Sequence, residues 1–295
     1  MCGRAYPRQV APFGGAGSVS RPGLRGHTWC LHSDVAEYRR CLAEFFAEGV
    51  EDGLRVAYVS SDGAEASRAD LAGLGELDRL LAGGALQVLS TRDIYGAAGP
   101  VDPERVVTCL AAATEQAVAH GFRGLAVSGD ATELVRASAH RDAFARSEFL
   151  LDCYMATHPL SALCGYGLEL GNDTVAEFAV LHAPGPSNEV PFQVFGCADG
   201  AIGLAGEFDP AGVAALARVL PRLQTTDGGT LVIIMAGVDY VDHRLLLTLD
   251  AYARGNGVAV SLRSAPPFAA HLMELLPVFS LQLAKSGAQG SGAQG

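Results

Sequence analysis

Apolar and polar positions along residues 27–182 alternate between two kinds of pattern. Short apolar runs indicate buried strands at His27–Leu31, Leu54–Ser60, Leu86–Leu89, Leu125–Ser128 and Ser161–Tyr166. Between these runs, apolar residues recur at helical spacing over 34–46, Ala64–Leu74, 102–121, Arg141–Thr157 and Asp173–His182. Strands that alternate with helices predict a mostly parallel sheet covered by helices on both faces, which is a three-layer α/β fold.

The pattern differs after residue 190. Two strands, Phe192–Cys197 and Ala201–Gly206, are separated by Ala198-Asp199-Gly200, which predicts a hairpin. The following predicted elements are helices at 209–220, His243–Arg254 and Pro266–Leu276 and strands at Thr230–Met235 and Val258–Leu262. A hairpin followed by alternating helices and strands predicts a second, smaller α/β sandwich.

Segments rich in glycine, proline and serine divide the chain. The strongest run of residues that break helices and strands is Ala183–Asn188, and it separates the two patterns. We therefore predict a flexible arm (1–24), a first domain (25–183), a linker (184–190), a second domain (191–285) and a flexible tail (286–295).

Composition restricts the class of protein. Hydrophobic residues make up 49% and charged residues 18% of the 295 residues, which is typical of globular domains. The net charge of -11 argues against binding to nucleic acid or to an anionic membrane surface. No apolar run has the length of a membrane span or of a signal peptide. The seven cysteines form no CxxC pair, which indicates reduced thiols. We expect a cytoplasmic protein without a cofactor.

The single lysine of the chain, Lys285, excludes several enzyme classes. A nucleotide-binding P-loop places a lysine on the phosphates, and Schiff-base enzymes use a lysine nucleophile. Because Lys285 is the last residue of the predicted second domain, neither chemistry is available within the body of the fold.

One strand carries a group of candidate metal ligands. His27, Cys30 and His32 form an HxxCxH cluster, and Cys164 belongs to another predicted strand. Imidazole and thiolate are ligands that zinc and other transition metals prefer. Three interpretations remain open, namely a metal site, a ligand contact through His27 and Cys30 without metal, and a strand whose side chains simply pack.

Carboxylates form a second candidate group. Asp130, Glu133 and Glu148 are close enough in the predicted order of elements to supply paired carboxylates for acid–base catalysis. The alternative is structural, with Glu148 either a hydrogen-bond partner between helices or a solvated side chain. Without a P-loop lysine we favour the structural interpretation.

The second domain resembles the STAS domains of bacterial anti-sigma factor antagonists. The resemblance rests on Gly206-Glu207-Phe208-Asp209, on Val238–Asp242 and on the order of elements. It implies binding of an anti-sigma factor or a related kinase-like protein through the residues Glu207, Asp209, Asp239, Asp242, His243 and Arg244. Arg244 stands where the family has its phosphorylated serine, so no phosphorylation is expected there.

The first domain resembles the MEDS family of sensory domains, degenerate relatives of the RecA/KaiC fold. The residues that carry the resemblance are His27–Cys30, Phe45-Phe46, Leu86–Leu89 with Tyr95, Ser128–Asp130, Glu148 and Cys164–Tyr166. It implies a RecA-like three-layer sheet that senses a small organic ligand. The expected ligand-binding residues are His27, Cys30, Asp130, Glu148 and Cys164.

Together these features predict a non-enzymatic bacterial regulator that alters transcription indirectly. A ligand in the first domain is expected to change how the second domain binds its partner. Two alternatives remain: a nucleotide- or metal-dependent enzyme on a degenerate RecA-like fold, and a self-associating scaffold that binds no ligand. Formation of a homodimer is also compatible with the interpretation as a regulator.

Overall fold

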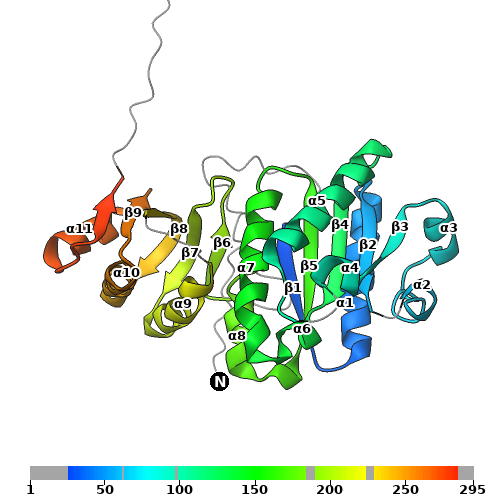
Figure 1. Ribbon diagram of the computed structural model, residues 1–295, viewed down its shortest axis with the longest axis horizontal. Helices are drawn as coiled ribbons and strands as arrows, with labels where there is room; N and C mark the ends of the chain where they lie inside the picture. Colours follow the sequence, from blue (N-terminus) through cyan, green and yellow to red (C-terminus); the bar gives the residue numbers. More distant parts are fainter. Residues whose placement is uncertain (1–25, 62, 97–98, 184–189, 224–228, 285–295) are drawn as a thin grey trace, which may run out of the picture.

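Two α/β units lie side by side in the computed structural model (Figure 1). The structure describes residues 26–61, 63–96, 99–183, 190–223 and 229–284. The predicted arm (1–24), nearly all of the predicted linker, Lys285 and the predicted tail lie outside these ranges. Within them, no helix combines the length and the apolar composition that crossing a membrane requires.

The first unit is built on a five-stranded sheet whose strands all pair in parallel. The strands are β1 (His27–His32), β2 (Arg55–Ser60), β3 (Leu86–Ser90), β4 (Leu125–Asp130) and β5 (Leu160–Gly167). Their order is β1-β5-β4-β2-β3. The chain crosses the sheet in one direction from β1 to β3 and returns from β3 to β5, so its connections diverge between the neighbouring strands β2 and β4. The predicted parallel sheet is confirmed.

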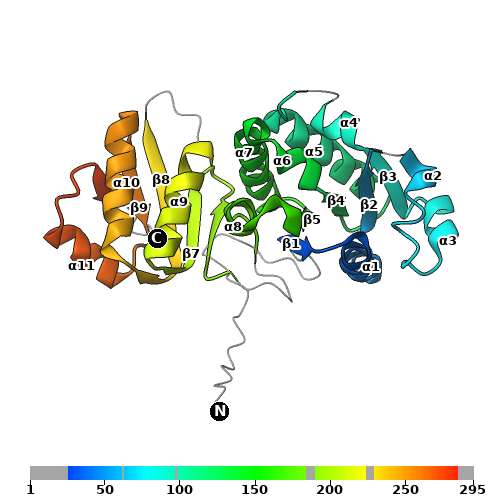
Figure 2. The same cartoon turned by 90° about the horizontal axis from the view of Figure 1, so that it is seen from below.

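Helices cover both faces of this sheet (Figure 2). One face is covered by α1 (Val35–Glu51), which buries Tyr38, Leu42 and Phe46 against the sheet. The other face is covered by α5 (Pro103–Ala119) and α7 (Ser138–Met155). The shorter helices are α2 (Gly63–Ala66), α3 (Leu77–Ala82), α4 (Thr91–Tyr95), α6 (Thr132–Arg136), α8 (Asn172–Ala179) and the 3-10 turn η1 (Leu168–Leu170).

The predicted helix Ala64–Leu74 is wrong over most of its length. Only α2 is helical there, and residues 67–74 form turns. The carboxylate of Asp70 holds these turns against the domain, because it accepts hydrogen bonds from Arg39 Nε at 2.9 Å and from Tyr58 Oη at 3.0 Å. Tertiary contacts therefore override the helix propensity of this segment.

The second unit has a mixed five-stranded sheet in the order β10-β9-β8-β7-β6. Its elements are β6 (Phe192–Gly196), β7 (Ile202–Phe208), α9 (Pro210–Leu223), β8 (Thr230–Val241), α10 (His243–Asn256), β9 (Ala259–Arg263), α11 (Pro267–Leu275) and β10 (Leu281–Leu283). β6 and β7 form the predicted antiparallel hairpin, and the other pairs are parallel. β8 extends beyond the predicted end at Met235, and β10 was not predicted.

Helix α7 joins the two units. Its side chains belong to the same continuous hydrophobic core as those of β6 and α9, so the core runs from one sheet to the other. The backbone N–H of Gly196 donates to Asp152 Oδ2 at 3.2 Å, and that of Val194 donates to the carbonyl of Val180 at 2.7 Å. The edge strand β6 is thereby fixed to the first unit through its own backbone.

An ion-pair network extends this contact at the surface. Arg222 of α9 lies 2.7 Å from Glu177 Oε2 and 2.9 Å from Asp142 Oδ1, both in the first unit. Arg218 lies 3.4 Å from the same glutamate, and Arg146 of α7 donates to the carbonyl of Leu223. These contacts couple the units at the end of α9.

Candidate functional site

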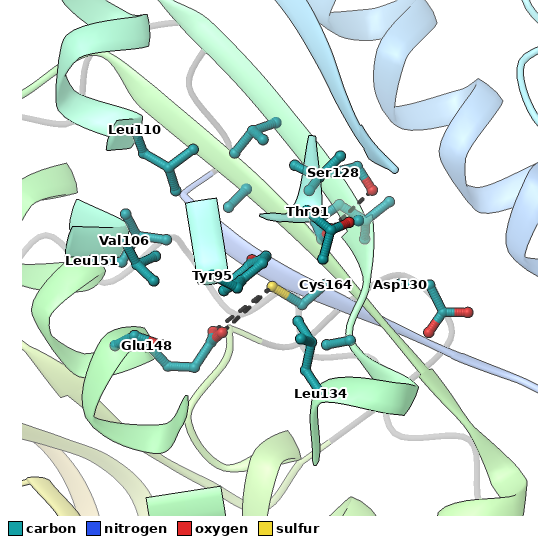
Figure 3. Close-up of a pocket in the computed structure, with 17 residues that line it drawn as sticks. Thr91, Tyr95, Val106, Leu110, Ser128, Asp130, Leu134, Glu148, Leu151 and Cys164 are labelled. Atoms are coloured by element: carbon teal, nitrogen blue, oxygen red, sulfur yellow. Dashed lines mark hydrogen bonds between the residues drawn. The ribbon is translucent and has the colours of Figure 1, made fainter. Parts of the chain in front are cut away.

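A small cavity lies between the carboxyl ends of β2, β4 and β5 and the helices α4 to α7. This is the point where the strand order reverses, the usual ligand position in open parallel sheets. The cavity volume is about 30 Å³, and most of its walls are apolar. Figure 3 shows Tyr95, Glu148 and Cys164 around it, with the carboxylate of Glu148 and the thiol of Cys164 pointing toward each other.

Glu148 and Cys164 belong to a buried cluster that two histidines complete. Glu148 Oε2 lies 2.7 Å from His27 Nε2 and 3.1 Å from His182 Nε2. Cys164 Sγ lies 3.7 Å from Glu148 Oε2 and 3.5 Å from His27 Nε2. Four donor atoms of three types used for metals in proteins, namely imidazole nitrogen, carboxylate oxygen and thiol sulfur, therefore meet at one point.

The fold explains why these residues meet. β1 pairs with β5 so that His27 stands opposite Ala162, and Cys164 follows two residues along on the same face. Just after α8 in the chain, the backbone N–H of Ala183 donates to the carbonyl of His27 at 2.8 Å. This hydrogen bond places the preceding residue, His182, beside β1. The ring centroids of the two histidines are 4.2 Å apart. Glu148 reaches the cluster from α7.

Burial and charge oppose each other in this cluster. Burial alone would raise the pKa of Glu148, but His27 and His182 outweigh it and lower that pKa to about 2. Burial would lower the pKa of His27, yet Glu148 and Asp152 hold it well above its usual value. Burial and His27 would lower the pKa of His182, but Cys164 and Glu148 raise it to about 9. The prediction that Glu148 is an interhelical or solvated side chain is wrong, because its partners are two buried histidines.

Cys30 does not join the cluster. His27 and Cys30 are three residues apart on one strand, so their side chains point to opposite faces of the sheet. The thiol of Cys30 packs on the α1 side and contacts Cys41, and burial together with this contact raises its pKa. The HxxCxH spacing therefore does not converge, and the interpretation of His27, Cys30 and His32 as a metal site is wrong.

His32 instead pairs with Asp130 at the end of β4. Its Nε2 lies 3.1 Å from Asp130 Oδ2. Burial would lower the pKa of His32, but the hydrogen bond and the charge of Asp130 raise it. Glu169 and Cys41, the other titratable groups near the ring, raise it as well. Burial would raise the pKa of Asp130, but His32 and Thr132 lower it. Asp130 borders the cavity, yet in Figure 3 it lies apart from Glu148 and Cys164.

The His32–Asp130 pair predicts a defined pH dependence. A raised histidine pKa stabilises the fold below its unfolded value near 6.5, and a lowered aspartate pKa stabilises it above about 3.8. The pair should therefore contribute most between about pH 4 and pH 6.5. Because the Asp130 side chain is 37% exposed, we expect Asp130→Asn to cost about 0.5–1 kcal/mol.

Titration of the His32 ring protons by NMR checks this expectation. In Asp130→Asn the pKa of His32 should fall, because the hydrogen bond and the charge of Asp130 are lost while burial remains. Glu169→Gln serves as the control, since it removes a more distant charge and should leave the pKa above 6.5. An unchanged His32 titration in Asp130→Asn would contradict the pairing.

The three candidate catalytic carboxylates have separate partners. Glu133 is exposed and lies 2.6 Å from Arg136, Asp130 is bound to His32 and Thr132, and Glu148 is bound to the histidines. The arrangement gives no pair of carboxylates that face one substrate.

The predicted partner-binding residues gather at the carboxyl ends of two neighbouring strands of the second sheet, β7 and β8. The ends of β7 and β8 are neighbours, with Glu207 opposite Tyr240. Asp209 caps α9 by accepting from Gly212 N at 2.8 Å, and Asp242 caps α10 by accepting from Arg244 N at 2.8 Å. The remaining members of the set are Asp239, on the exposed end of β8, and His243, 3.3 Å from Asp242.

Sequence reasoning missed one residue of the buried cluster, His182, and one residue that supports it, Asp152. His182 was placed at the end of a predicted helix before the linker, with no partner assigned. Asp152 lies one helical turn after Glu148, on the same face of α7, and its Oδ1 is 3.0 Å from His27 Nδ1. The i, i+4 spacing of two acids on an otherwise apolar helix face was the available signal.

Comparison with known protein families gives two matches. The model of MEDS, the methanogen/methylotroph DcmR sensory domain, matches residues 26–183, and the model described as Mlab, STAS domain, matches residues 195–281. These matches define a protein built from two regulatory domains. The chain belongs to the MEDS family, because that match covers more than half of its 295 residues. The STAS domain supports a signalling role like that of anti-sigma factor antagonists. No curated protein and no solved structure matches significantly.

Proposed function

We propose that this chain is a non-enzymatic bacterial regulator in which the MEDS domain binds a small ligand and the STAS domain binds an anti-sigma factor or a related kinase-like protein. Release of a sigma factor would then change transcription without DNA contact by this chain. The observation that carries the proposal is the position of α7, which forms a wall of the cavity and also packs on the STAS domain.

The cavity limits the ligand to a few non-hydrogen atoms. A volume of about 30 Å³ corresponds to roughly two water molecules. Glu148 and Cys164 supply polar contacts, and apolar side chains supply the remaining walls. A ligand that shifts α7 would act on the STAS domain through the contact between Asp152 and Gly196. The ligand shifts the equilibrium between two arrangements of the domains only by the difference between its binding free energies for them.

The start of α1 supports a function other than nucleotide hydrolysis. In P-loop proteins the N-terminus of the helix after the first strand binds phosphate. Here only Ser33 and Asp34 separate β1 from α1, and Asp34 accepts from Glu37 N at 2.9 Å. A carboxylate already occupies the positive end of that helix, and it would repel a phosphate.

The STAS surface combines charge with an exposed aromatic ring. Tyr240 is 50% exposed and stands opposite Glu207 in the register of β7 and β8, and Asp209 and Asp239 add exposed negative charge at the ends of these strands. Such a surface fits a basic partner patch and would speed its approach. Arg244, 58% exposed and 3.9 Å from Asp242, stands on the same side. No side-chain hydroxyl is available at that position for a phosphate switch.

Charge reversal on this surface tests the proposal. We expect Glu207→Lys to weaken partner binding at least about 10-fold, because like charges then face each other in the interface. Asp242→Asn should weaken binding through loss of charge while keeping the helix cap, since asparagine caps as well as aspartate. The measurement is affinity purification of the full chain from its host with mass spectrometry, followed by a binding titration with the partner.

Glu115→Lys provides the matched control, because Glu115 is an exposed acid on α5 of the other domain. It should bind the partner as the unmodified chain does. Failure to recover any anti-sigma factor or kinase-like protein would overturn the proposal, and so would equal binding by Glu207→Lys.

A further inference from the structure

The buried cluster of the MEDS domain has the composition of a metal centre. His27, Glu148, Cys164 and His182 each offer one donor atom, and all four atoms lie within 4.8 Å of one another. A tetrahedral zinc ion with bonds of 2.0–2.3 Å places its donor atoms about 3.3–3.8 Å apart. The Sγ–Nε2 distance of 3.5 Å and the Sγ–Oε2 distance of 3.7 Å have these values. The distances from Glu148 Oε2 to Nε2 of His27 and His182, 2.7 and 3.1 Å, are shorter and would lengthen to about 3.3 Å around an ion.

In each imidazole a hydrogen bond fixes Nδ1 as the protonated nitrogen, so Nε2 is the nitrogen that can bind a metal. His182 Nδ1 lies 2.8 Å from the carbonyl oxygen of Phe178, so Nδ1 carries the proton and donates it. His27 Nδ1 lies 3.0 Å from Asp152 Oδ1, an arrangement that also places the proton on Nδ1. Metal-binding histidines show this pattern, with a carboxylate or carbonyl behind the ring and the lone pair of Nε2 toward the ion.

A second observation points to a missing partner. His182 is fully buried, and its Nε2 faces Glu148 Oε2 at 3.1 Å without the alignment of a hydrogen bond to any described residue. Buried ring nitrogens are normally satisfied, because an unsatisfied polar atom costs about 1–3 kcal/mol. A cation at the centre of the four donors would satisfy this nitrogen.

We propose that His27 Nε2, His182 Nε2, the Cys164 thiolate and the Glu148 carboxylate bind one divalent transition-metal ion, with zinc as the best fit. Two neutral imidazoles, one thiolate and one carboxylate carry a charge of -2, which the ion neutralises in a buried site. Mixed nitrogen, sulfur and oxygen donors favour zinc over the oxygen-preferring calcium and magnesium. The inference rests on this geometry and does not depend on partner binding by the STAS domain.

The site forms part of the cavity wall. Glu148 and Cys164 line the cavity, while the two histidines lie behind them. Asp152 holds His27 with one oxygen and the STAS strand β6 with the other, at Gly196 N. Because Asp152 contacts both His27 and Gly196, an ion that holds His27 in place would also hold this contact between the two domains.

The test uses the purified full-length chain stripped of metal with a chelator. Titration with Co²⁺ should give one equivalent of binding, a thiolate-to-cobalt charge-transfer band and the intense visible bands of tetrahedral cobalt. Competition with a chromogenic chelator should show one tight Zn²⁺ site. Because both readouts use the unmodified chain, they remain informative if a variant fails to fold.

Variants assign the ligands. In Cys164→Ser the charge-transfer band should disappear, and in His182→Gln the Zn²⁺ affinity should fall at least about 100-fold. Asp152→Asn should weaken it about 10–100-fold, because it changes only the group behind His27. The matched controls are Cys109→Ser, on α5 beside the carbonyl of Asp93, and the exposed His271→Gln.

Two results would overturn the proposal. One is the absence of a cobalt charge-transfer band and of a competing Zn²⁺ site in the unmodified chain. The other is a band that persists in Cys164→Ser and disappears in Cys109→Ser. Either outcome would mean that the four residues form a hydrogen-bonded ion cluster without metal, and it would leave the proposed partner binding untouched.

Discussion

Gly206→Ala is expected to destabilise the STAS domain by about 2–5 kcal/mol. Gly206 has φ +88, a backbone conformation that costs an L-residue about 1–3 kcal/mol. An added Cβ would also lie 2.4 Å from the carbonyl oxygen of Pro191 and 2.9 Å from the Cα of Phe192, both of them backbone atoms. Overpacking of this kind costs about 1–3 kcal/mol.

The position of Gly206 explains the size of the effect. The register between β7 and β8 shifts at Gly206, and the next residue, Glu207, donates its N–H to the carbonyl of Pro191 at 2.8 Å. This bulge sets the direction of the chain into Asp209 and α9. A displaced bulge would also displace Glu207, so the variant should lose partner binding along with stability.

Differential scanning calorimetry measures this loss. Because the two domains share one core and are expected to unfold together, the melting temperature of the whole chain should fall by about 4–10 °C. Gly255→Ala is the matched control, because its Cβ would meet no atom within 4 Å and its helix gains propensity. A melting temperature in Gly206→Ala equal to that of the control would contradict the strain argument.

The period of the apolar residues was sufficient to predict the two sheets and most of their helices. β1, β2, β4, β5 and the β6–β7 hairpin are short runs with clear turn signals, so local patterning determines them. The segment after α2 was predicted wrongly because Asp70 binds Arg39 and Tyr58, which are 31 and 12 residues away. A contact of that kind leaves no trace in local periodicity.

The candidate site was predictable only in part, for the same reason. His27, Glu148 and Cys164 were assigned to one sensor site, and the structure brings them together. His182 was missed because it reaches the site through the pairing of Ala183 with β1, which lies more than 150 residues earlier in the chain. Cys30 was included although the two-residue period of a strand places it on the face opposite His27. Strict use of that period would have removed it.

Gly196→Ala is expected to uncouple the two domains. The Cβ of an alanine would lie 2.3 Å from the carbonyl oxygen of Phe149 and 2.6 Å from Cys153 Sγ, both on α7. Since Phe149 O belongs to the helix backbone, β6 must move away from α7, and the bond from Gly196 N to Asp152 would lengthen. We expect a loss of about 1–3 kcal/mol from the interface.

The shared core makes this effect visible in the shape of the unfolding curve. Because one continuous core joins the domains, the unmodified chain should unfold in a single calorimetric transition. In Gly196→Ala the curve should separate into two transitions, one for each domain. The ion pairs of Arg222 with Glu177 and Asp142 would remain, but they lie at the end of α9 and do not replace the packing of β6 against α7. Gly255→Ala should keep the single transition, and a single unshifted transition in Gly196→Ala would show that α7 does not couple the domains.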